Sequence, residues 1–529
     1  MTDDWRAEFQ ESRADGVAKP RIEAHPERDG VRLVDPIEGV DFTLLTPEPV
    51  EPVDRDPDDF YFPVDTAARI YTTELVTPFK VNIWIRDAQG GLVRHSEGGE
   101  SVSVSDARYN IELSSTHVKV YLLIDGDVSL RSSEEKVSIS TSTADTITIG
   151  IRSLHDQPAG TVTTTETPED LMQALSSFGS ALKTTTCERS YPTLRGHPPL
   201  IEFGDSLSIP ASIDSPKTDI TIQVPPSLEY VFPITSLAYY LGATVEPADS
   251  PRMLVGDKHY SLTDDGGFGE TVERILKHVF LMDCLTRTEG YYDVNLHERN
   301  KVEEQVNLDF PALYQLDIVE QLNRYLSVPY SVVEQAVPNW KLTADILPKP
   351  DHATTLPYLA NELAIIRCPS RDEIKMRSPS ETSDRVNDFF DSLAADESEI
   401  FARGAANDFP SEPVFQPKPA NSVEHVYVGE GIPIGTGKMS PEAFQQRLSS
   451  DFTDDVQTNI VVVCNDSSMT SENTVSTIYE RSQWTNVDVS VRNQLSVTSL
   501  AKLLGQDIDF LHYVGHVDKM GLKCADGYL

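Results

Sequence analysis

Alternating strand and helix patterns near the C-terminus constrain the fold of this chain most strongly. Residues 459–464 read Asn-Ile-Val-Val-Val-Cys, and residues 509–514 hold Phe, Leu, Tyr and Val around one histidine. Short apolar runs of this kind predict strands that are buried on both faces of a parallel sheet. Residues 488–495 alternate between apolar and polar side chains, which predicts a third strand nearer an edge.

Helical patterns connect the three predicted strands. The first covers about residues 471–483, and the second covers residues 499–504, with Thr498 placed to cap it and Gly505 placed to end it. Strand, helix, strand, helix and strand with short connections predict a right-handed parallel unit.

A histidine follows the last of these strands. The run ends in Gly515-His516, and ligand-binding and catalytic groups in open α/β sheets gather at the carboxyl ends of strands. We therefore expect His516 at that edge, at the end of a central strand and partly exposed, with His512 more deeply buried. Asp466 and the turn at residues 495–496 should open toward the same edge.

At this point the sequence resembles a known family. The strand and helix order, followed by Leu511-His-Tyr-Val-Gly-His516, resembles the caspase–hemoglobinase fold and, within it, the CHAT domain, a caspase-like module related to separase. Residues 521–529 resemble the short hairpin that follows the catalytic histidine in CHAT proteins. The resemblance covers about the last fifth of the chain. It implies a cysteine peptidase with a Cys–His dyad, with His516 in the position of the general base.

Two departures from the family pattern bear on activity. The family's nucleophilic cysteine ends the next strand, and this sequence has no residue there because it stops at Leu529. Val517 stands where the family has a glycine whose N–H helps to form the oxyanion hole, and valine does not reach glycine conformations. As given, the chain should not hydrolyse peptides. Two alternatives stay open: a fragment of a longer cysteine peptidase, or a non-catalytic interaction protein with a degenerate module.

Cysteine usage limits the other kinds of site. Cys524 follows His516 by eight residues and could be a displaced nucleophile, but a small buried hydrophobe is the favoured interpretation. The cysteines are far apart and form no C-x-x-C pair, so neither a zinc ribbon nor a disulfide framework is expected. No metal site or cofactor is predicted. The five are Cys187, Cys284, Cys368, Cys464 and Cys524.

The charge of the chain indicates its environment. Acidic residues number 84 against 44 basic ones, a net charge of −40 that is spread along the whole sequence. Such a surface repels nucleic acid and anionic membranes, so the predicted partners are proteins or peptides. Salt screens the repulsion between these charges. We therefore predict that the protein comes from a halophile with a salt-rich cytoplasm, specifically a haloarchaeon. The N-terminus has no apolar signal segment and no run has transmembrane length, which predicts a cytoplasmic protein.

Composition and periodicity divide the chain into five parts. Residues 1–59 predict a polar arm rich in proline and acid, and residues 60–155 alternate with the spacing of a β-sandwich-like domain. Residues 156–370 predict a mixed α/β region, and residues 371–422 an acidic helix and a proline-rich linker. Residues 423–529 form the CHAT-like module. The expected fold class is therefore multidomain, with β and α/β parts, and the regions before the module are interpreted as sensing or docking regions.

Two further features of the sequence receive no functional role. The helix predicted for residues 270–287 carries His278, and a lone histidine at such a position is usually solvated or capped and is not a ligand. Residues 431–439 resemble a phosphate-binding loop, but Ile432 replaces the first glycine and Met439 replaces the hydroxyl residue that would bind Mg²⁺. Nucleotide binding is not expected.

Overall fold

The computed structural model describes residues 19–96, 101–133, 136–264, 266–292, 294–369, 375–377, 414–449, 458–465, 487–506, 508–518 and 521–529. The chain divides into two compact units. Unit 1 is Met1–Met376 with Glu412–Pro441, and unit 2 is Arg377–Ser411 with Glu442–Leu529. Among the described residues no helix is long and apolar enough to cross a membrane.

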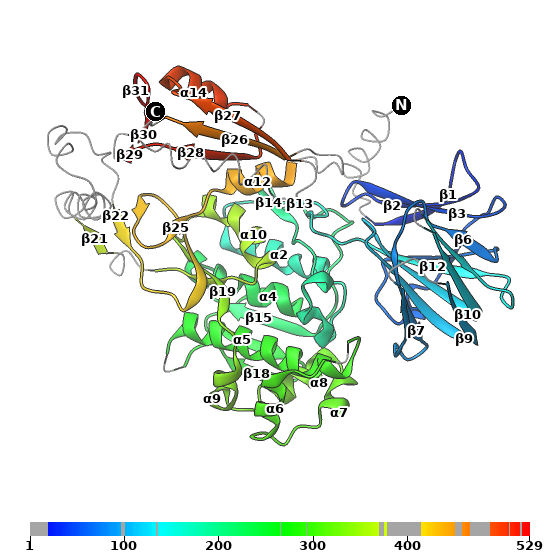
Figure 1. The fold of residues 1–529 in the computed structure, drawn as a ribbon. Coiled ribbons are helices and arrows are strands. Elements are labelled where there is room, and N and C mark those ends of the chain that lie inside the picture. The colour runs from blue at the N-terminus through cyan, green and yellow to red at the C-terminus, as the bar shows by residue number, and fades with distance from the viewer. Residues whose placement is uncertain are drawn as a thin grey trace. The chain divides into compact units, whose positions relative to one another are not determined.

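The first part of unit 1 is a large antiparallel sheet (Figure 1). The long strand β10 pairs with β9 along most of its length, whereas β12 pairs with its first part and β11 with its last part. Apolar side chains from strands along the sheet pack in one core. The strands expected for residues 60–155 are therefore present, as parts of one large antiparallel sheet. The strands are β1 (Arg21–Ala24), β2 (Gly30–Asp35), β3 (Val40–Leu45), β4 (Val53–Arg55), β5 (Thr66–Ile70), β6 (Glu74–Val76), β7 (Asn82–Asp87), β8 (Leu92–Ser96), β9 (Ser101–Ser114), β10 (Lys119–Ser132), β11 (Val137–Ser140) and β12 (Ile147–Arg152).

The structure differs from the irregular arm expected for residues 1–59, because β1 to β4 belong to this sheet. Val31 and Leu33 on β2 and Phe42 on β3 are buried in its core. They alternate with polar residues, so a period-two pattern is present but weak in a polar stretch. Gly30 has φ +145°, and a Cβ at that position would lie 2.2 Å from the carbonyl oxygen of Leu44, so the hairpin requires glycine here.

The middle of unit 1 is mixed α/β, as expected (Figure 1). Thr167 caps α2 by accepting a hydrogen bond from the Asp170 N–H, and α5 matches the predicted helix within two residues. The helix α4 is buried along its whole length and ends at Gly242. The elements are β13 (Thr161–Thr164), α2 (Pro168–Ser176), β14 (Leu200–Phe203), β15 (Ile220–Val224), α3 (Leu228–Val231), α4 (Thr235–Leu241), β16 (Thr244–Pro247), β17 (Arg252–Val255), β18 (Lys258–Ser261), α5 (Phe268–Thr286), α6 (His297–Glu303), α7 (Phe310–Tyr314), α8 (Ile318–Tyr325) and α9 (Tyr330–Val333).

Unit 1 ends in a parallel sheet with the order β20-β19-β23-β25. Its third strand pairs with β19 over most of its length, so the predicted start of the C-terminal module at Val423 lies inside unit 1. Most of the predicted acidic helix and linker lies outside the described residues. The elements are β19 (Trp340–Ile346), α10 (Leu356–Asn361), β20 (Ile365–Arg367), β21 (Lys375–Arg377), β22 (Val414–Gln416), β23 (Ser422–Val428), β24 (Ile432–Pro433) and β25 (Gly437–Lys438).

Unit 2 contains the three parallel strands predicted from the sequence. The order is β27-β26-β28, and β26 pairs in parallel with both neighbours. The helix α14 packs on the face of the sheet that holds Val461 and Val463. The elements are α12 (Pro441–Ser449), β26 (Thr458–Cys464), β27 (Val487–Asn493), α14 (Val497–Leu504), β28 (Phe510–Val514), β29 (Val517–Asp518), β30 (Gly521–Cys524) and β31 (Gly527–Tyr528).

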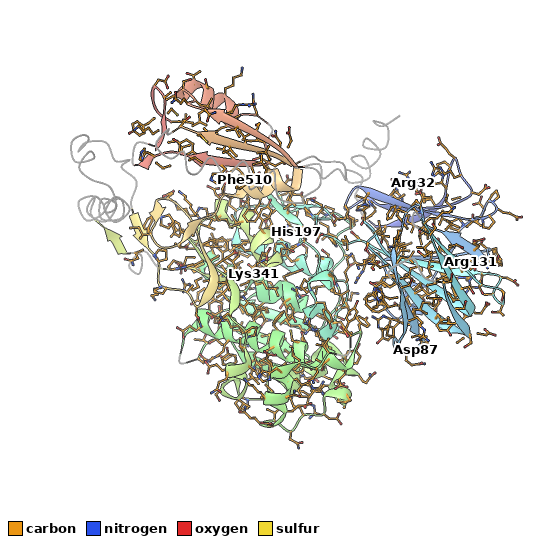
Figure 2. All side chains as sticks on the ribbon, viewed as in Figure 1. Arg32, Asp87, Arg131, His197, Lys341 and Phe510 are labelled. Atoms are coloured by element: carbon orange, nitrogen blue, oxygen red, sulfur yellow. The ribbon has the colours of Figure 1, made fainter. Side chains whose placement is uncertain are left out.

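Two details of unit 2 correct the sequence analysis. The central strand is β26, whereas β28 has a described neighbour on one side only, and Phe510 at its start (labelled in Figure 2) is 48% exposed. The cap of α14 is Ser496, whose hydroxyl accepts a hydrogen bond from the Ser499 N–H, and not Thr498. The helix predicted for residues 471–483 and Asp466 lie outside the described residues.

Candidate active site

The carboxyl ends of the three strands in unit 2 lie at one level. Cys464, the last residue of β26, is paired with Asn493 at the end of β27 and with Val514 at the end of β28. The first strand in the sequence lies in the middle, so the chain goes to one side for β27 and to the other for β28. Ligand sites in open α/β sheets form at such a reversal of strand order, outside the carboxyl ends. In unit 2 this place lies beside residues 464–465 and 514–516.

His516 lies at this edge, two residues beyond the end of β28. Its side chain is half-buried, which agrees with the partial exposure that we expected for His516. His512, inside the strand, is half-buried as well, so the predicted difference in burial between the two histidines is absent.

A hairpin holds the main chain of His516. The strands β30 and β31 are antiparallel neighbours, which agrees with the hairpin expected for residues 521–529. The Lys523 N–H donates a hydrogen bond of 3.0 Å to the carbonyl oxygen of His516. The single proton of the Tyr513 hydroxyl is donated to the carbonyl oxygen of Lys523, and the same hydroxyl lies 3.4 Å from the carbonyl oxygen of His516. The loop after β28 is thus fixed from its own strand and from the hairpin.

The side chain of Asn465 crosses the edge between the strands. Its Oδ1 accepts a hydrogen bond of 2.6 Å from the Leu495 N–H. Its Nδ2 donates to the carbonyl oxygens of Leu495 and Lys523, both at 3.3 Å. Asn465 was not among the site residues predicted from the sequence. A polar residue directly after a β-branched apolar strand was the available signal, and its partners were not readable from the sequence.

The cysteines of unit 2 are buried away from solvent on opposite faces of the sheet. Cys464 packs with Ile460 and Val462 on one face, and Cys524 packs with Val461 and Val463 on the other. Burial, together with the nearby charge of Asp526, raises the pKa of Cys524 above its ordinary value. A raised pKa disfavours the thiolate that a nucleophile needs, which supports the interpretation of Cys524 as a small buried hydrophobe.

The residue after the histidine keeps an extended conformation. Val517 begins β29, which pairs with β30, and its side chain is 53% exposed. The backbone there is part of a short ladder and does not use the left-handed region that a glycine would open.

Unit 1 holds a polar cluster that the sequence analysis did not predict. Arg367 makes two hydrogen bonds, of 2.7 and 2.8 Å, to the carboxylate of Asp345, and His425 Nε2 lies 2.7 Å from the same carboxylate. Arg367 also donates to the carbonyl oxygens of Lys418 and Pro419. The carboxylate and the guanidinium are therefore used to join β20, β19 and the segment that enters β23. We interpret this cluster as structural.

The other features considered in the sequence also have structural explanations. The Lys438 ammonium donates a hydrogen bond of 3.0 Å to the carbonyl oxygen of Gly431, so in this loop the lysine faces the backbone. His278 is buried in α5. In the described parts of the chain, no group of three or more His, Cys, Asp or Glu side chains is arranged to hold a metal ion.

Comparison with known proteins gives no family assignment: no family model, no curated protein and no solved structure matches this chain. The geometry of the edge in unit 2 therefore carries the functional proposal.

Proposed function

We propose that unit 2 is a CHAT-type, cysteine peptidase-like module in which His516 is the general base. The observation that carries this proposal is the place of His516. It follows the strand beside the central β26, at the edge where the strand order reverses. The resemblance of residues 511–516 to the CHAT pattern points to the same role. The antiparallel sheet of unit 1 would then be a sensing or docking region of a halophile's cytoplasmic protein, with a protein or peptide as partner.

The chemistry of such a site is acyl transfer. The neutral imidazole of His516 takes the proton of a thiol, and the thiolate attacks the carbonyl carbon of the substrate. The tetrahedral intermediate then expels the amine, which receives the proton from the imidazolium, and water releases the acyl group from the sulfur. A cofactor is not needed for any of these steps.

A second candidate function is a non-catalytic interaction module. The observation that favours it is the burial of Cys464 and Cys524, the two thiols of unit 2. His516 lies at the edge in the position of a base, whereas the two cysteines of unit 2 are packed in apolar clusters. For these 529 residues we therefore expect no peptide hydrolysis, although the module could still bind peptides at this edge.

The proposed role of His516 as a general base can be tested with an added thiol, which takes the place of a cysteine nucleophile of the protein. A panel of peptide p-nitrophenyl esters is mixed with the protein and millimolar 2-mercaptoethanol in molar KCl, and release of p-nitrophenolate is followed. If His516 is a base beside a peptide site, thiolysis should be at least about 10-fold faster with the wild type than with His516→Gln. The variant His512→Gln should keep the wild-type rate.

Equal rates for the wild type and His516→Gln would reject the base role and leave the interaction module. The cysteines are tested separately with a peptide acyloxymethyl ketone and mass spectrometry. Stoichiometric labelling of Cys524 that is lost in His516→Gln would instead identify Cys524 as the nucleophile, against our expectation.

A further inference from the structure

We propose that Asn465 is a positioning residue for His516. This inference rests on the proposed function for its catalytic meaning. Its structural part, that Asn465 fixes the chain on which His516 lies, stands on the hydrogen bonds alone. No contact between the Asn465 and His516 side chains is required.

The backbone of Asn465 holds the end of β28. Its N–H donates a hydrogen bond of 2.9 Å to the carbonyl oxygen of Val514. This bond continues the ladder between β26 and β28 by one residue and ends directly before Gly515. The exit of the central strand thus fixes the start of the segment that leads to His516.

The side-chain amide of Asn465 joins two other elements at the same point. Both donor bonds of Nδ2 go to main-chain carbonyl oxygens, one of Leu495 after β27 and one of Lys523 in β30. The Leu495 carbonyl oxygen also accepts from the Ala525 N–H at 2.9 Å. The hairpin is therefore attached to the end of β27 through a network in which Asn465 takes part.

Lys523 of the hairpin connects the Asn465 side chain to His516. Lys523 accepts from Asn465 through its carbonyl oxygen and donates through its N–H to the His516 carbonyl oxygen at 3.0 Å. The Asn465 side chain and the main chain of His516 are thus linked by hydrogen bonds through one intervening residue, Lys523. Loss of the amide donors would leave the Lys523 carbonyl oxygen with the Tyr513 hydroxyl as its remaining side-chain donor. This loosens the Lys523 peptide, whose N–H binds the His516 carbonyl oxygen.

The chemistry of the position demands an amide. A carboxylate of the same shape would still accept from the Leu495 N–H, but it would present oxygen to two carbonyl oxygens that now receive N–H donors. The isosteric variant Asn465→Asp therefore removes the two donor bonds and keeps the acceptor bond. Asn493 is exposed at the end of β27, so Asn493→Asp is a matched control with the same change of charge on the same edge.

Hydrogen exchange tests the structural part. In Asn465→Asp the amides of residues 522–525 should exchange about 10-fold faster than in the wild type, while those of 460–463 keep their protection. Asn493→Asp should match the wild type at both places. If Asn465→Asp does not fold, Asn465→Ala replaces it. This variant adds no charge and should show the same pattern of exchange. Unchanged exchange at residues 522–525 in a folded variant would overturn the proposal.

Thiolysis with added 2-mercaptoethanol tests the catalytic meaning. Asn465→Asp should lower the rate at saturating ester about 10-fold with little change in KM, whereas a merely stabilising residue would not alter the rate of the folded protein. An unchanged rate in the folded variant overturns the positioning role. If the wild-type rate itself does not depend on His516, the proposed function fails, and the exchange data then decide the structural part alone.

Discussion

Arg189 and Asp283 show how this fold treats charge at the level of single residues. Both side chains are fully buried, and their ion pair has an N–O distance of 2.7 Å. The Tyr240 hydroxyl donates a further hydrogen bond of 2.6 Å to the Asp283 carboxylate, and the Tyr240 ring lies under the guanidinium. In a chain with an excess of acid, a buried carboxylate is thus supplied with a cation and a hydroxyl donor.

His278 is a buried ionisable group, and its titration should make the stability of the fold depend on pH. Its side chain packs in α5 with a ring contact to Tyr330, and burial lowers the pKa of His278 to about 4. In the unfolded chain the His278 side chain takes up a proton near pH 6.5. Above that pH His278 is neutral in both states and does not lower the free energy of unfolding. We expect a loss of up to about 3 kcal/mol between pH 6.5 and pH 4.

The measurement is urea unfolding at constant molar KCl, followed by circular dichroism at several pH values. In His278→Leu the free energy of unfolding should fall less steeply with acid than in the wild type, since every other titrating group is common to both proteins. His259→Gln, at an exposed position, is the control. Parallel pH curves for the wild type and His278→Leu would contradict this prediction.

The sequence predicted the place of His516 because only the end of a recognisable strand was needed. It did not predict Asn465, whose side chain bonds to Lys523, 58 residues further along the chain. Nor did it predict that Arg367 and His425 share Asp345. Such side-chain contacts depend on which strands become neighbours, and one sequence without its fold does not contain that information in readable form.

At the level of elements, the first turn of α14 offers a sharp comparison. Thr498 and Ser496 are both residue types that cap helices, but only Ser496 accepts from the Ser499 N–H, and its backbone has the extended conformation of a cap. We expect Ser496→Ala to destabilise α14 by about 1 kcal/mol and Thr498→Ala to have a much smaller effect. Hydrogen exchange of the amides of residues 499–503 measures the difference. A larger effect of Thr498→Ala would show that the helix begins later.

Apolar runs predicted the strands of unit 2, and helical periodicity of apolar residues predicted α5. Strand order was not readable, because β28 is as apolar as a central strand although β26 occupies the centre. The strands between residues 21 and 55 were missed for the opposite reason. Their alternating apolar residues stand among many acids and prolines, so composition suggested an arm where the pattern formed strands.

For the whole molecule, the net charge of −40 predicts that folding requires salt. Screening shortens the range of repulsion from about 10 Å at 0.1 M salt to about 3 Å at 1 M. We expect native circular dichroism in molar KCl and loss of the signal on dialysis to about 0.05 M. Sucrose of equal osmolality is the control, because it is excluded from the protein surface but does not screen charge. A full native signal at low salt would contradict the halophilic interpretation.

The position of β26 also has a consequence for biosynthesis. The central strand is translated before both strands that cover its edges, and β28 is complete only about 50 residues after it. At about 5–20 residues per second, this run of valines and isoleucine waits for several seconds on the ribosome. During that time its unpaired backbone can join strands of other nascent chains. The order of strands that creates the edge of the candidate site thus gives every newly made copy an early interval in which it needs protection from its neighbours.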